Sequence, residues 1–314
     1  MPEKGLVWPQ EERQDEMKIG FSVPQYARLA SDAGQVARFA RELEAAGADS
    51  LWVGDRPFAA VDPVVGYGGV MDTIPEEFNA VLDPFTLLGA VAGATERVQL
   101  GTHVLAATWY PPVVLARALT TIDVVSNGRL LVGLGISWSP EEYEAVGLEF
   151  RQRGKRLDET LDALEAIWTA DPAEYHGALV EVPRHHSSLK PVQRPGPPIY
   201  LSSFSEAALR RAGRRGDGWL PIIIPGQIDL DALCAQRAIV EKAALEAGRD
   251  PNALDALVRV NVAKGDAPRA VADDIRRVAD AIGSEHFFIE QMYTDDTVDQ
   301  AITSAIAYLN LGLR

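Results

Sequence analysis

Three observations predict that this chain folds as an α/β protein, a closed (β/α)8 TIM barrel. Eight short apolar segments are each followed by a segment whose apolar residues recur at helical spacing. The short segments are apolar throughout, which is typical of parallel strands buried on both faces. Eight such pairs within 314 residues fit one barrel. The alternative, a doubly wound open sheet, is disfavoured because the first turn, SVPQYARLASDAG, lacks the glycine pattern of a dinucleotide-binding fold.

The first half of the chain supplies four strand–helix pairs. Gly47 is expected to end the first helix in a left-handed cap, and Asp83 with Pro84 to begin the second as N-cap and first helical residue. Ser139 is expected to cap a helical segment after the fourth strand. The pairs are expected at 18–23 and 34–48, 49–53 and 83–95, 97–107 and 111–126, and 128–135 and 156–168.

The second half continues this alternation after an irregular stretch. Its strand–helix pairs are expected at 197–203 and 205–213, 217–223 and 230–248, 254–263 and 268–283, and 286–290 and 297–309. The first 16 residues are charged and lack such periodicity. We therefore expect residues 1–16 to be a flexible N-terminal extension and residues 17–314 to form a single barrel domain.

Composition restricts the class of function. A formal net charge of −15 argues against a nucleic-acid or anionic-membrane surface and favours a small-molecule substrate. The single cysteine, Cys234, excludes an intramolecular disulfide, and no Cys/His cluster has the spacing of a zinc site, so we expect no metal. The sequence also has no run of 18 apolar residues and no signal-peptide core. A cytoplasmic protein is the expectation.

The residues that follow each strand are the candidates for function, because active sites of (β/α)8 barrels lie at the carboxyl ends of the strands. They include no nucleophile with an adjacent base and no carboxylate pair at metal spacing. Such a set suggests that a cofactor supplies the chemistry. In strand order these residues are Pro24 and Gln25; Asp55 and Arg56; Thr102 and His103; Ile136, Ser137 and Trp138; Ser202, Ser203 and Ser205; Pro221; Lys264; and Glu290.

The stretch YLSSFSEAALRRAG runs from the fifth strand through three serines into a helix. Ser203 and Glu206 have the spacing of a capping box, so Ser203 is expected as the N-cap. Free N–H groups and hydroxyls at a helix start also suit a phosphate. Capping and phosphate binding both remain open, and they are compatible if the phosphate takes the donors that Ser203 leaves free.

Four stretches together resemble the luciferase-like monooxygenase superfamily, particularly its coenzyme F420-dependent oxidoreductases. They are AAGADSLWVGDRP, RVQLGTHVLAATWYPPVVLARALTTIDVVSNGRLLVGLGISW, EEYEAVGLEFRQRGKRLDETLDALEAIW and PPIYLSSFSEAALRRAGRRGDGWLP. The resemblance implies a TIM barrel with an insertion between strands four and five, at residues 171–196. It also implies a flavin or deazaflavin across the barrel mouth, with its ring near strands two to four and its phosphate near the fifth helix.

Carried over residue by residue, the resemblance implies three catalytic candidates. Asp55 matches the family's Asp-His pair at the end of strand two, whereas Arg56 replaces the histidine. An arginine there would neutralise an anionic ring or a substrate carboxylate, and it is no general acid near neutral pH. His103 lies where relatives carry a bulge that often contains a non-prolyl cis peptide. It is expected either to lie near the ring or to be a hydrogen-bonded histidine of the barrel.

The cofactor-binding candidates come from strands three, four and five. Ser137 occupies a position where many relatives have glycine, so close approach of the backbone to the cofactor is in question there. The polyglutamate tail of F420 would favour basic residues near strand five, for which Lys190, Arg194 and Arg210 are candidates. The cofactor-binding set is Thr102, His103, Val104, Gly135, Ile136, Ser137, Ser202, Ser203, Phe204 and Ser205.

The resemblance predicts F420-dependent hydride transfer to or from a small organic substrate. The alternatives are a monooxygenase that uses reduced FMN, and a flavin- or deazaflavin-binding barrel without catalysis. The long loop at 57–82 is expected to cover the barrel mouth as a lid. A homodimer built through apolar positions on the second and third helices is also expected.

Overall fold

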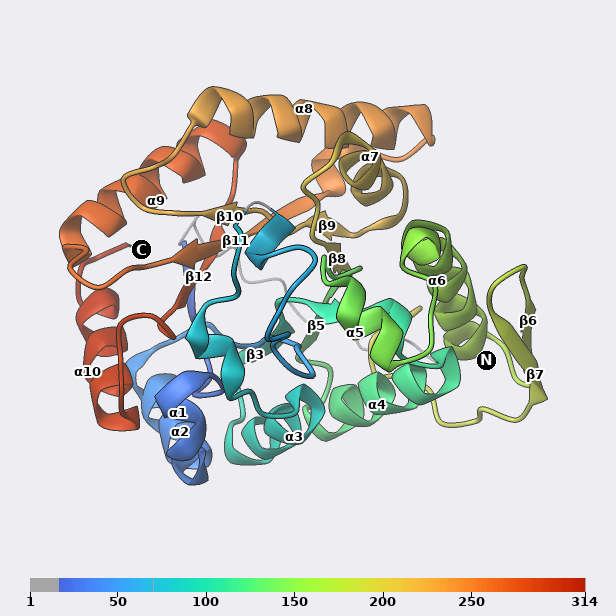
Figure 1. The fold of residues 1–314 in the computed structure, drawn as a ribbon, viewed down its shortest axis with the longest axis horizontal. Coiled ribbons are helices and arrows are strands. Elements are labelled where there is room, and N and C mark those ends of the chain that lie inside the picture. Colours follow the sequence, from blue (N-terminus) through green and yellow to red (C-terminus); the bar gives the residue numbers. More distant parts are fainter. Residues whose placement is uncertain (1–16, 70, 314) are drawn as a thin grey trace, which may run out of the picture.

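The computed structural model describes residues 17–69 and 71–313 and confirms the predicted barrel (Figure 1). The expected N-terminal extension, residues 1–16, lies outside the described residues. All strand pairings within the barrel are parallel, and helices surround the sheet on its outer side. The chain therefore places the carboxyl ends of all barrel strands at one end, which we call the barrel mouth.

Ten short strands of the described residues build the eight barrel positions, because the third position is split into β3 and β4 and the sixth into β9 and β10. The sheet closes through β12, which pairs with both β1 and β11, while β11 also pairs with β9. The strands are β1 (Lys18–Ser22), β2 (Ser50–Val53), β3 (Gln99–Thr102), β4 (Leu105–Ala106), β5 (Leu130–Gly135), β8 (Ile199–Leu201), β9 (Gly218–Trp219), β10 (Ile222–Ile223), β11 (Asp255–Asn261) and β12 (His286–Glu290).

The helices begin and end close to the predicted positions. Gly47 has the predicted left-handed conformation, with φ of 98°. Asp83 accepts a hydrogen bond of 2.7 Å from the Thr86 amide, which confirms it as an N-cap. The helices are α1 (Ala27–Ser31), α2 (Val36–Ala46), α3 (Pro84–Ala94), α4 (Pro112–Val125), α5 (Pro140–Ala145), α6 (Arg153–Thr169), α7 (Glu206–Arg215), α8 (Leu230–Glu246), α9 (Pro268–Ile282) and α10 (Val298–Leu309).

Ser139 precedes α5 as predicted, but its side chain makes no capping bond. The hydroxyl instead donates to Glu141 Oε2 at 2.7 Å. The prediction of position was therefore correct, whereas the expected capping bond is not made, and the Glu141 carboxylate orients the hydroxyl instead.

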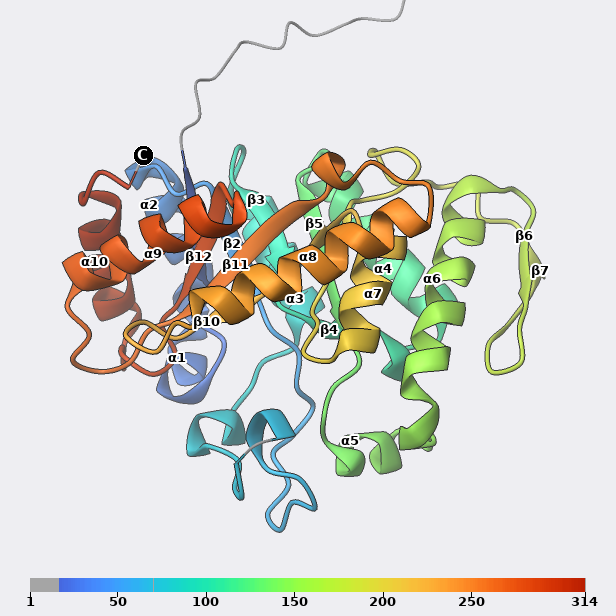
Figure 2. The same ribbon diagram turned by 90° about the horizontal axis from the view of Figure 1, so that it is seen from above.

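The predicted insertion between strands four and five is an antiparallel hairpin. Its strands are β6 (Ala173–His176) and β7 (Glu181–His185), and it lies outside the barrel beside α6 (Figures 1 and 2). The eight-strand count of the barrel is thus unchanged by the insertion.

The barrel interior is filled around one indole. Trp52 is fully buried, stacks on Phe288 with ring centroids 4.3 Å apart, and donates from Nε1 to Ser50 Oγ at 2.7 Å. On the neighbouring strand β3, a Cβ at Gly101 would overlap the Trp52 ring. The glycine therefore creates the space that the indole occupies, as dense interior packing requires.

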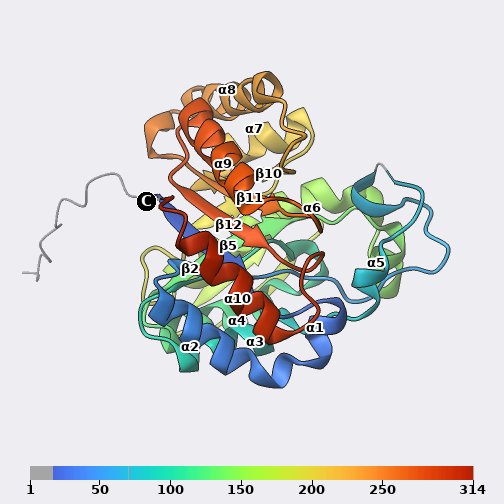
Figure 3. The ribbon, with the colours of Figure 1, turned by 90° about the vertical axis from the view of Figure 1, so that its left-hand side faces the viewer.

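The loop that is expected to form a lid, described at residues 57–69 and 71–82 and here called the lid loop, lies with α5 beyond the carboxyl ends of the strands (Figures 2 and 3). Ring contacts join them: Tyr67 of the loop lies 5.8 Å from Trp138, which precedes α5, and 5.0 Å from Phe78. The Val64 amide donates to Glu141 of α5 at 2.6 Å. In this structure the lid loop is docked on the segment that follows strand four.

Candidate functional site

The end of strand two presents a carboxylate to the mouth. Asp55 Oδ2 accepts hydrogen bonds from the Ala106 amide at 3.1 Å and from the Tyr110 hydroxyl at 2.9 Å. Burial raises the pKa of Asp55 to about 6, although both of these bonds act in the opposite direction. A carboxyl group with such a pKa exchanges a proton in the range where many enzymes operate.

Arg56, the next residue, is engaged by a carboxylate that the sequence analysis missed. Its Nη1 lies 3.0 Å from Oε1 of Glu142 on α5, and the two side chains are 6% and 0% exposed. The guanidinium lies between two rings, 4.3 Å from the Trp138 centroid and 4.9 Å from that of Phe78. Its charge is already balanced here, so the prediction that it faces an anionic ring or carboxylate requires this pair to open.

Glu142 is held from a second side by Ser137. The Ser137 hydroxyl donates to Glu142 Oε2 at 2.6 Å. Burial raises the pKa of Glu142 to about 7, and both Arg56 and Ser137 oppose that rise. The one signal in the sequence was its place in the E-x-x-x-x-G run from Glu142 to Gly147, which gave no hint of its partner.

The expected bulge in strand three is present. The peptide between His103 and Val104 is cis, and it separates β3 from β4. A Cβ at Gly135, at the end of strand four, would lie 2.6 Å from Val104 Cγ2. The structure therefore brings the predicted residues of strands three and four into direct contact.

The His103 ring lies inside the barrel, 1% exposed, with its centroid 5.2 Å from that of Phe288. Its Nε2 is 3.5 Å from Glu290 Oε2, and neither ring nitrogen has a hydrogen-bond partner among the described residues. Burial, with a smaller effect of Arg259, lowers its pKa well below the usual range, so the ring is neutral near neutral pH. Of the two alternatives for His103, the hydrogen-bonded barrel histidine is not observed.

Glu290 links three barrel strands below the mouth. Its Oε1 accepts from the Ser22 hydroxyl at 2.7 Å, and its Oε2 lies 3.2 Å from Arg259 Nη2. Ser22 and Arg259 were not predicted as site residues, because β1 and β11 are apolar strands in which one polar side chain gives no periodic signal. The cluster compensates the buried charges, as buried ions require.

Residues 136–138, between strand four and α5, have a left-handed backbone conformation at one position and two hydrogen-bonded contacts to neighbouring side chains. Ser137 has φ of 52°, the left-handed region in which glycine is favoured. The Tyr143 hydroxyl donates to the Ile136 carbonyl and contacts the Thr108 hydroxyl at 2.6 Å. These contacts hold residues 136–138 in place between β5 and α5.

The serine loop after strand five differs from the prediction in one respect. Helix α7 is capped by Ser205, whose Oγ accepts from the Ala208 amide at 3.4 Å, so the prediction of Ser203 as N-cap is wrong. Ser203 is buried and donates to the Leu201 carbonyl at 3.4 Å. The Ser202 amide donates to Leu134 O at 3.1 Å, which ties the loop to strand four, and Phe204 is 76% exposed.

The expected basic residues for a cofactor tail are not at the mouth. Lys190 donates to the Ile167 and Ala170 carbonyls at 2.5 Å, at the end of α6, and Arg194 precedes the start of β8. Arg210 is paired with Glu206 at 2.9 Å. The segment after the hairpin thus delivers Lys190 and Arg194 to the amino-terminal end of the barrel.

Two features of the site bear on whether it could hold a cofactor. Among the described residues, neither ring nitrogen of buried His103 has a hydrogen-bond partner, and α7 begins after the serine loop at the same end of the barrel. Among the described residues, no group of three or more His, Cys, Asp or Glu is arranged to hold a metal ion. None of the described helices is long and apolar enough to span a membrane.

Comparisons with known proteins agree with this geometry. The family described as luciferase-like monooxygenase matches residues 17–306. A phthiodiolone/phenolphthiodiolone dimycocerosates ketoreductase from Mycobacterium tuberculosis (strain CDC 1551 / Oshkosh) is 32% identical over 213 residues, which cover 65% of this chain and 54% of that protein. The aligned part thus spans about half the length of this curated relative.

Two solved structures share the fold at low sequence identity. An F420-dependent secondary alcohol dehydrogenase in complex with an F420-acetone adduct has a TM-score of 0.74 at 17% identity, covering 95% of this chain and 99% of that one. The oxygenating constituent of 3,6-diketocamphane monooxygenase from Pseudomonas putida, in complex with FMN, has a TM-score of 0.72 at 17% identity, covering 95% and 96%.

Proposed function

Because the chain belongs to the luciferase-like monooxygenase family, we propose that it is an F420-dependent oxidoreductase that transfers a hydride to or from a small organic substrate. The observation that carries the proposal is the mouth itself. It holds the buried ring of His103, which has no hydrogen-bond partner among the described residues, and the Asp55 carboxyl group, whose pKa burial raises to about 6. Such a site binds and positions reactants while a cofactor supplies the electrons.

In this proposal, F420 supplies the hydride when bound. The segment from Thr102 to Val104, together with Gly135, backs the ring, and the loop from Ser202 to Ser205 holds the phosphate through the N–H groups of residues 203–205 and the hydroxyls of Ser202 and Ser205. Ile136 and Ser137 border the ring from strand four. The exposed ring of Phe204 lies at the edge of the same loop.

Asp55 is the proposed proton-exchanging group. Reduction of a carbonyl requires a proton at oxygen as well as a hydride at carbon, and Asp55 holds a proton at weakly acidic pH. Tyr110 and the Ala106 amide both bond to Oδ2, which fixes the orientation of the carboxyl group. The lid loop excludes water from the mouth while the reactants are aligned.

The test is to titrate the purified protein separately with F420 and FMN and to follow cofactor fluorescence. Turnover is then followed with reduced F420 and a panel of small ketones, in wild type and Asp55→Asn. We expect F420 to bind and to be oxidised by at least one ketone, with loss of most activity but not of binding in Asp55→Asn. Binding of FMN alone, with oxygen consumption, would favour the monooxygenase. Binding without turnover would favour a non-catalytic barrel, and binding of neither cofactor would refute the cofactor assignment.

We also propose a homodimer through the outer faces of α3 and α4, which lie side by side on the barrel (Figure 1). Gly89 and Gly93 on α3 have open space where a Cβ would lie, and α4 exposes Val113, Val114 and Val125 by 39%, 40% and 55%. Small and apolar residues on one exposed face are typical of a protein interface. Sedimentation of wild type and Val125→Asp tests it: a wild-type monomer refutes the dimer.

The lone Cys234 suits a reducing compartment, so we propose a cytoplasmic location.

A further inference from the structure

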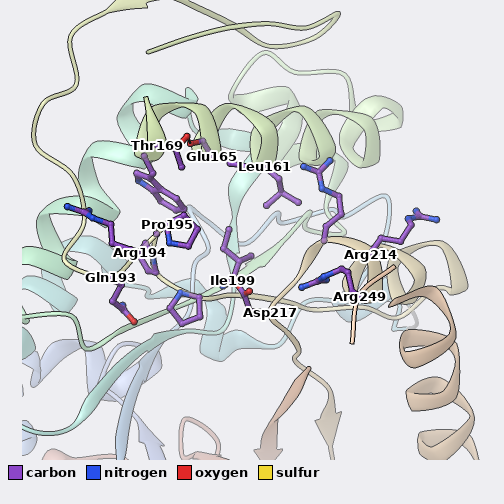
Figure 4. Close-up of a pocket in the computed structure, with 15 residues that line it drawn as sticks. Leu161, Glu165, Thr169, Gln193, Arg194, Pro195, Ile199, Arg214, Asp217 and Arg249 are labelled. Carbon is purple, nitrogen blue, oxygen red and sulfur yellow. Dashed lines mark hydrogen bonds between the residues drawn. The ribbon is translucent and has the colours of Figure 1, made fainter. Parts of the chain in front are cut away.

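A cavity lies at the opposite end of the barrel from the mouth, and Figure 4 shows residues that line it. Its volume is about 620 Å³, within the range of small-molecule sites. Ile199 begins β8 and Asp217 immediately precedes β9, and both line the cavity, which places it at the amino ends of these strands. The remaining walls come from residues 193–198 before β8, the second half of α6, the end of α7 and Arg249 after α8.

The cavity is positively charged in a chain whose overall charge is strongly negative. Four arginines line it, against two carboxylates. Arg215 is paired with Asp162, but Arg194, Arg214 and Arg249 have no ion-pair partner within the part of the chain that the structure describes. Figure 4 places Arg194 at one side of the cavity and Arg214 with Arg249 at the other.

Two of these arginines are nevertheless held in position. Arg249 Nη1 donates to the Gly213 carbonyl at 2.7 Å, and Arg194 Nη1 donates to the Pro191 carbonyl. A guanidinium has five N–H donors, so one backbone bond orients the group and leaves the others for a ligand. Guanidinium groups that are oriented but have no ion-pair partner among the described residues suit recognition of a carboxylate or phosphate on a ligand.

The floor of the cavity is apolar and rigid. Trp168 is 5% exposed, and a Cβ at Gly196 would overlap its ring, so the backbone of this segment lies directly against the indole. Prolines at 195, 197 and 198 flank Gly196 and restrict the backbone of the wall. A wall that is already ordered loses little conformational entropy when a ligand binds.

We propose that this cavity binds an organic anion, a small molecule with one carboxylate or phosphate group on an apolar body. Arg214 and Arg249 bind the anionic group, and the apolar body lies against Trp168 and the prolines. The charge selects the anion, and the apolar floor selects an organic ligand over a free inorganic ion. This site is separate from the mouth and does not depend on the chemistry proposed there.

The test uses two probes, phenyl phosphate and benzoate, in calorimetric titrations in phosphate-free buffer at low salt. We expect saturable binding of at least one probe, and the tighter probe identifies the anionic group that the site prefers. Inorganic phosphate is titrated in parallel and is expected to bind at least about tenfold more weakly, because it lacks the apolar body.

Variants locate the probe. Arg214→Gln and Arg249→Gln are each expected to weaken probe binding about tenfold, as loss of a charged hydrogen bond predicts. The matched control is Arg210→Gln, on the same helix α7 but paired with Glu206 outside the cavity, which is expected to bind like wild type. Circular dichroism melts check that all three fold.

Three results would overturn the proposal. They are absence of saturable binding by both probes, binding that persists unchanged in Arg214→Gln and Arg249→Gln, and equal affinity for inorganic phosphate and phenyl phosphate. The first result would show that the cavity binds neither probe. The second would show that the probe binds elsewhere on the protein. The third would show that the apolar residues do not contribute to recognition of the ligand.

Discussion

Arg56 Nη1 and Glu142 Oε1 lie 3.0 Å apart in the barrel mouth, and the two side chains have almost no access to solvent. One comes from the end of strand two and the other from the helix after strand four, so this ion pair connects two barrel positions. Its partners lie 86 positions apart in the numbering, Arg56 and Glu142, which is why neither residue predicts the other from local sequence.

Removing one partner of the Arg56–Glu142 ion pair should lower the free energy of unfolding. Above pH 7, where the Glu142 carboxyl is largely ionised, Glu142→Gln leaves the guanidinium of Arg56 buried and uncompensated, so we expect a loss of about 3–5 kcal/mol in the free energy of unfolding. In a double-mutant cycle with Arg56→Gln, the double variant should lose about 1–3 kcal/mol less than the sum of the two single variants. Urea denaturation measures all four proteins.

The control for that cycle is Glu144→Gln, which is exposed on the same helix α5. Its effect should stay within about 0.5 kcal/mol. Additive single and double effects of Arg56→Gln and Glu142→Gln would show that the pair contributes no coupling.

The Glu142 carboxyl should titrate near pH 7, because burial raises its pKa to about 7 from an ordinary value of 4.5. The folded protein then keeps this proton over a range in which the unfolded chain has lost it. The group's contribution to stability is therefore complete below about pH 4.5 and is lost as pH rises through 7.

Carbon-13 NMR of the glutamate carboxyls measures this titration, and Glu142→Gln assigns the resonance. Subtracting the variant's stability from that of wild type at each pH isolates the contribution of Glu142 from those of Asp55 and the buried histidines. A carboxyl that titrates near 4.5, or a stability difference that grows with pH, contradicts the prediction.

The docked lid loop should loosen when Tyr67 is truncated. Tyr67 contacts Trp138 and Phe78 through its ring, and its hydroxyl lies 3.5 Å from that of Tyr293. Loss of about 1–1.5 kcal/mol of ring contacts in Tyr67→Ala should speed amide hydrogen exchange about tenfold within residues 57–82 and leave the barrel strands unaffected. Phe58→Ala, which truncates another ring of the same loop, is the control. Unchanged exchange in Tyr67→Ala would mean that other contacts hold the loop.

Two substitutions at Ser137 should separate its backbone from its hydroxyl. Both Ser137→Ala and Ser137→Gly remove the 2.6 Å hydrogen bond to Glu142, but only glycine relieves the positive φ of 52°. We expect the alanine variant to be less stable than the glycine variant by about 1 kcal/mol. If Ser137→Gly also binds cofactor more tightly than wild type, the serine restricts the pocket. Equal stability of the two variants would show that the backbone carries no strain at Ser137.

The barrel was predictable because each of its eight strand–helix pairs has a local pattern, a short apolar run followed by apolar residues at helical spacing, whereas α1 and the two strands of the hairpin were not predicted. The cis peptide at His103 was predictable through the resemblance and not from the residues alone, since no local pattern requires it. In the serine loop, Ser203 and Ser205 both suit an N-cap. The choice of Ser205 depends on where α7 packs, which the sequence does not encode locally.

The site residues that were missed share one property. Ser22, Glu142 and Arg259 acquire their roles from partners on other elements of the fold, and none of them stands out in its local sequence pattern. The expectation for Arg194 failed for a related reason. Its position depends on the path of the chain after the hairpin, and that path ends at the far side of the barrel.

Trp52 and Gly101 occupy complementary space on neighbouring strands, so neither can change alone without an overlap or a hole. This coupling has an evolutionary consequence. Relatives that lack a large ring at the position of Trp52 should carry a side chain at the position of Gly101, and the two positions should vary as a pair. In the laboratory, a Gly101→Ala protein that fails to fold should be rescued by replacing Trp52 with a smaller apolar residue.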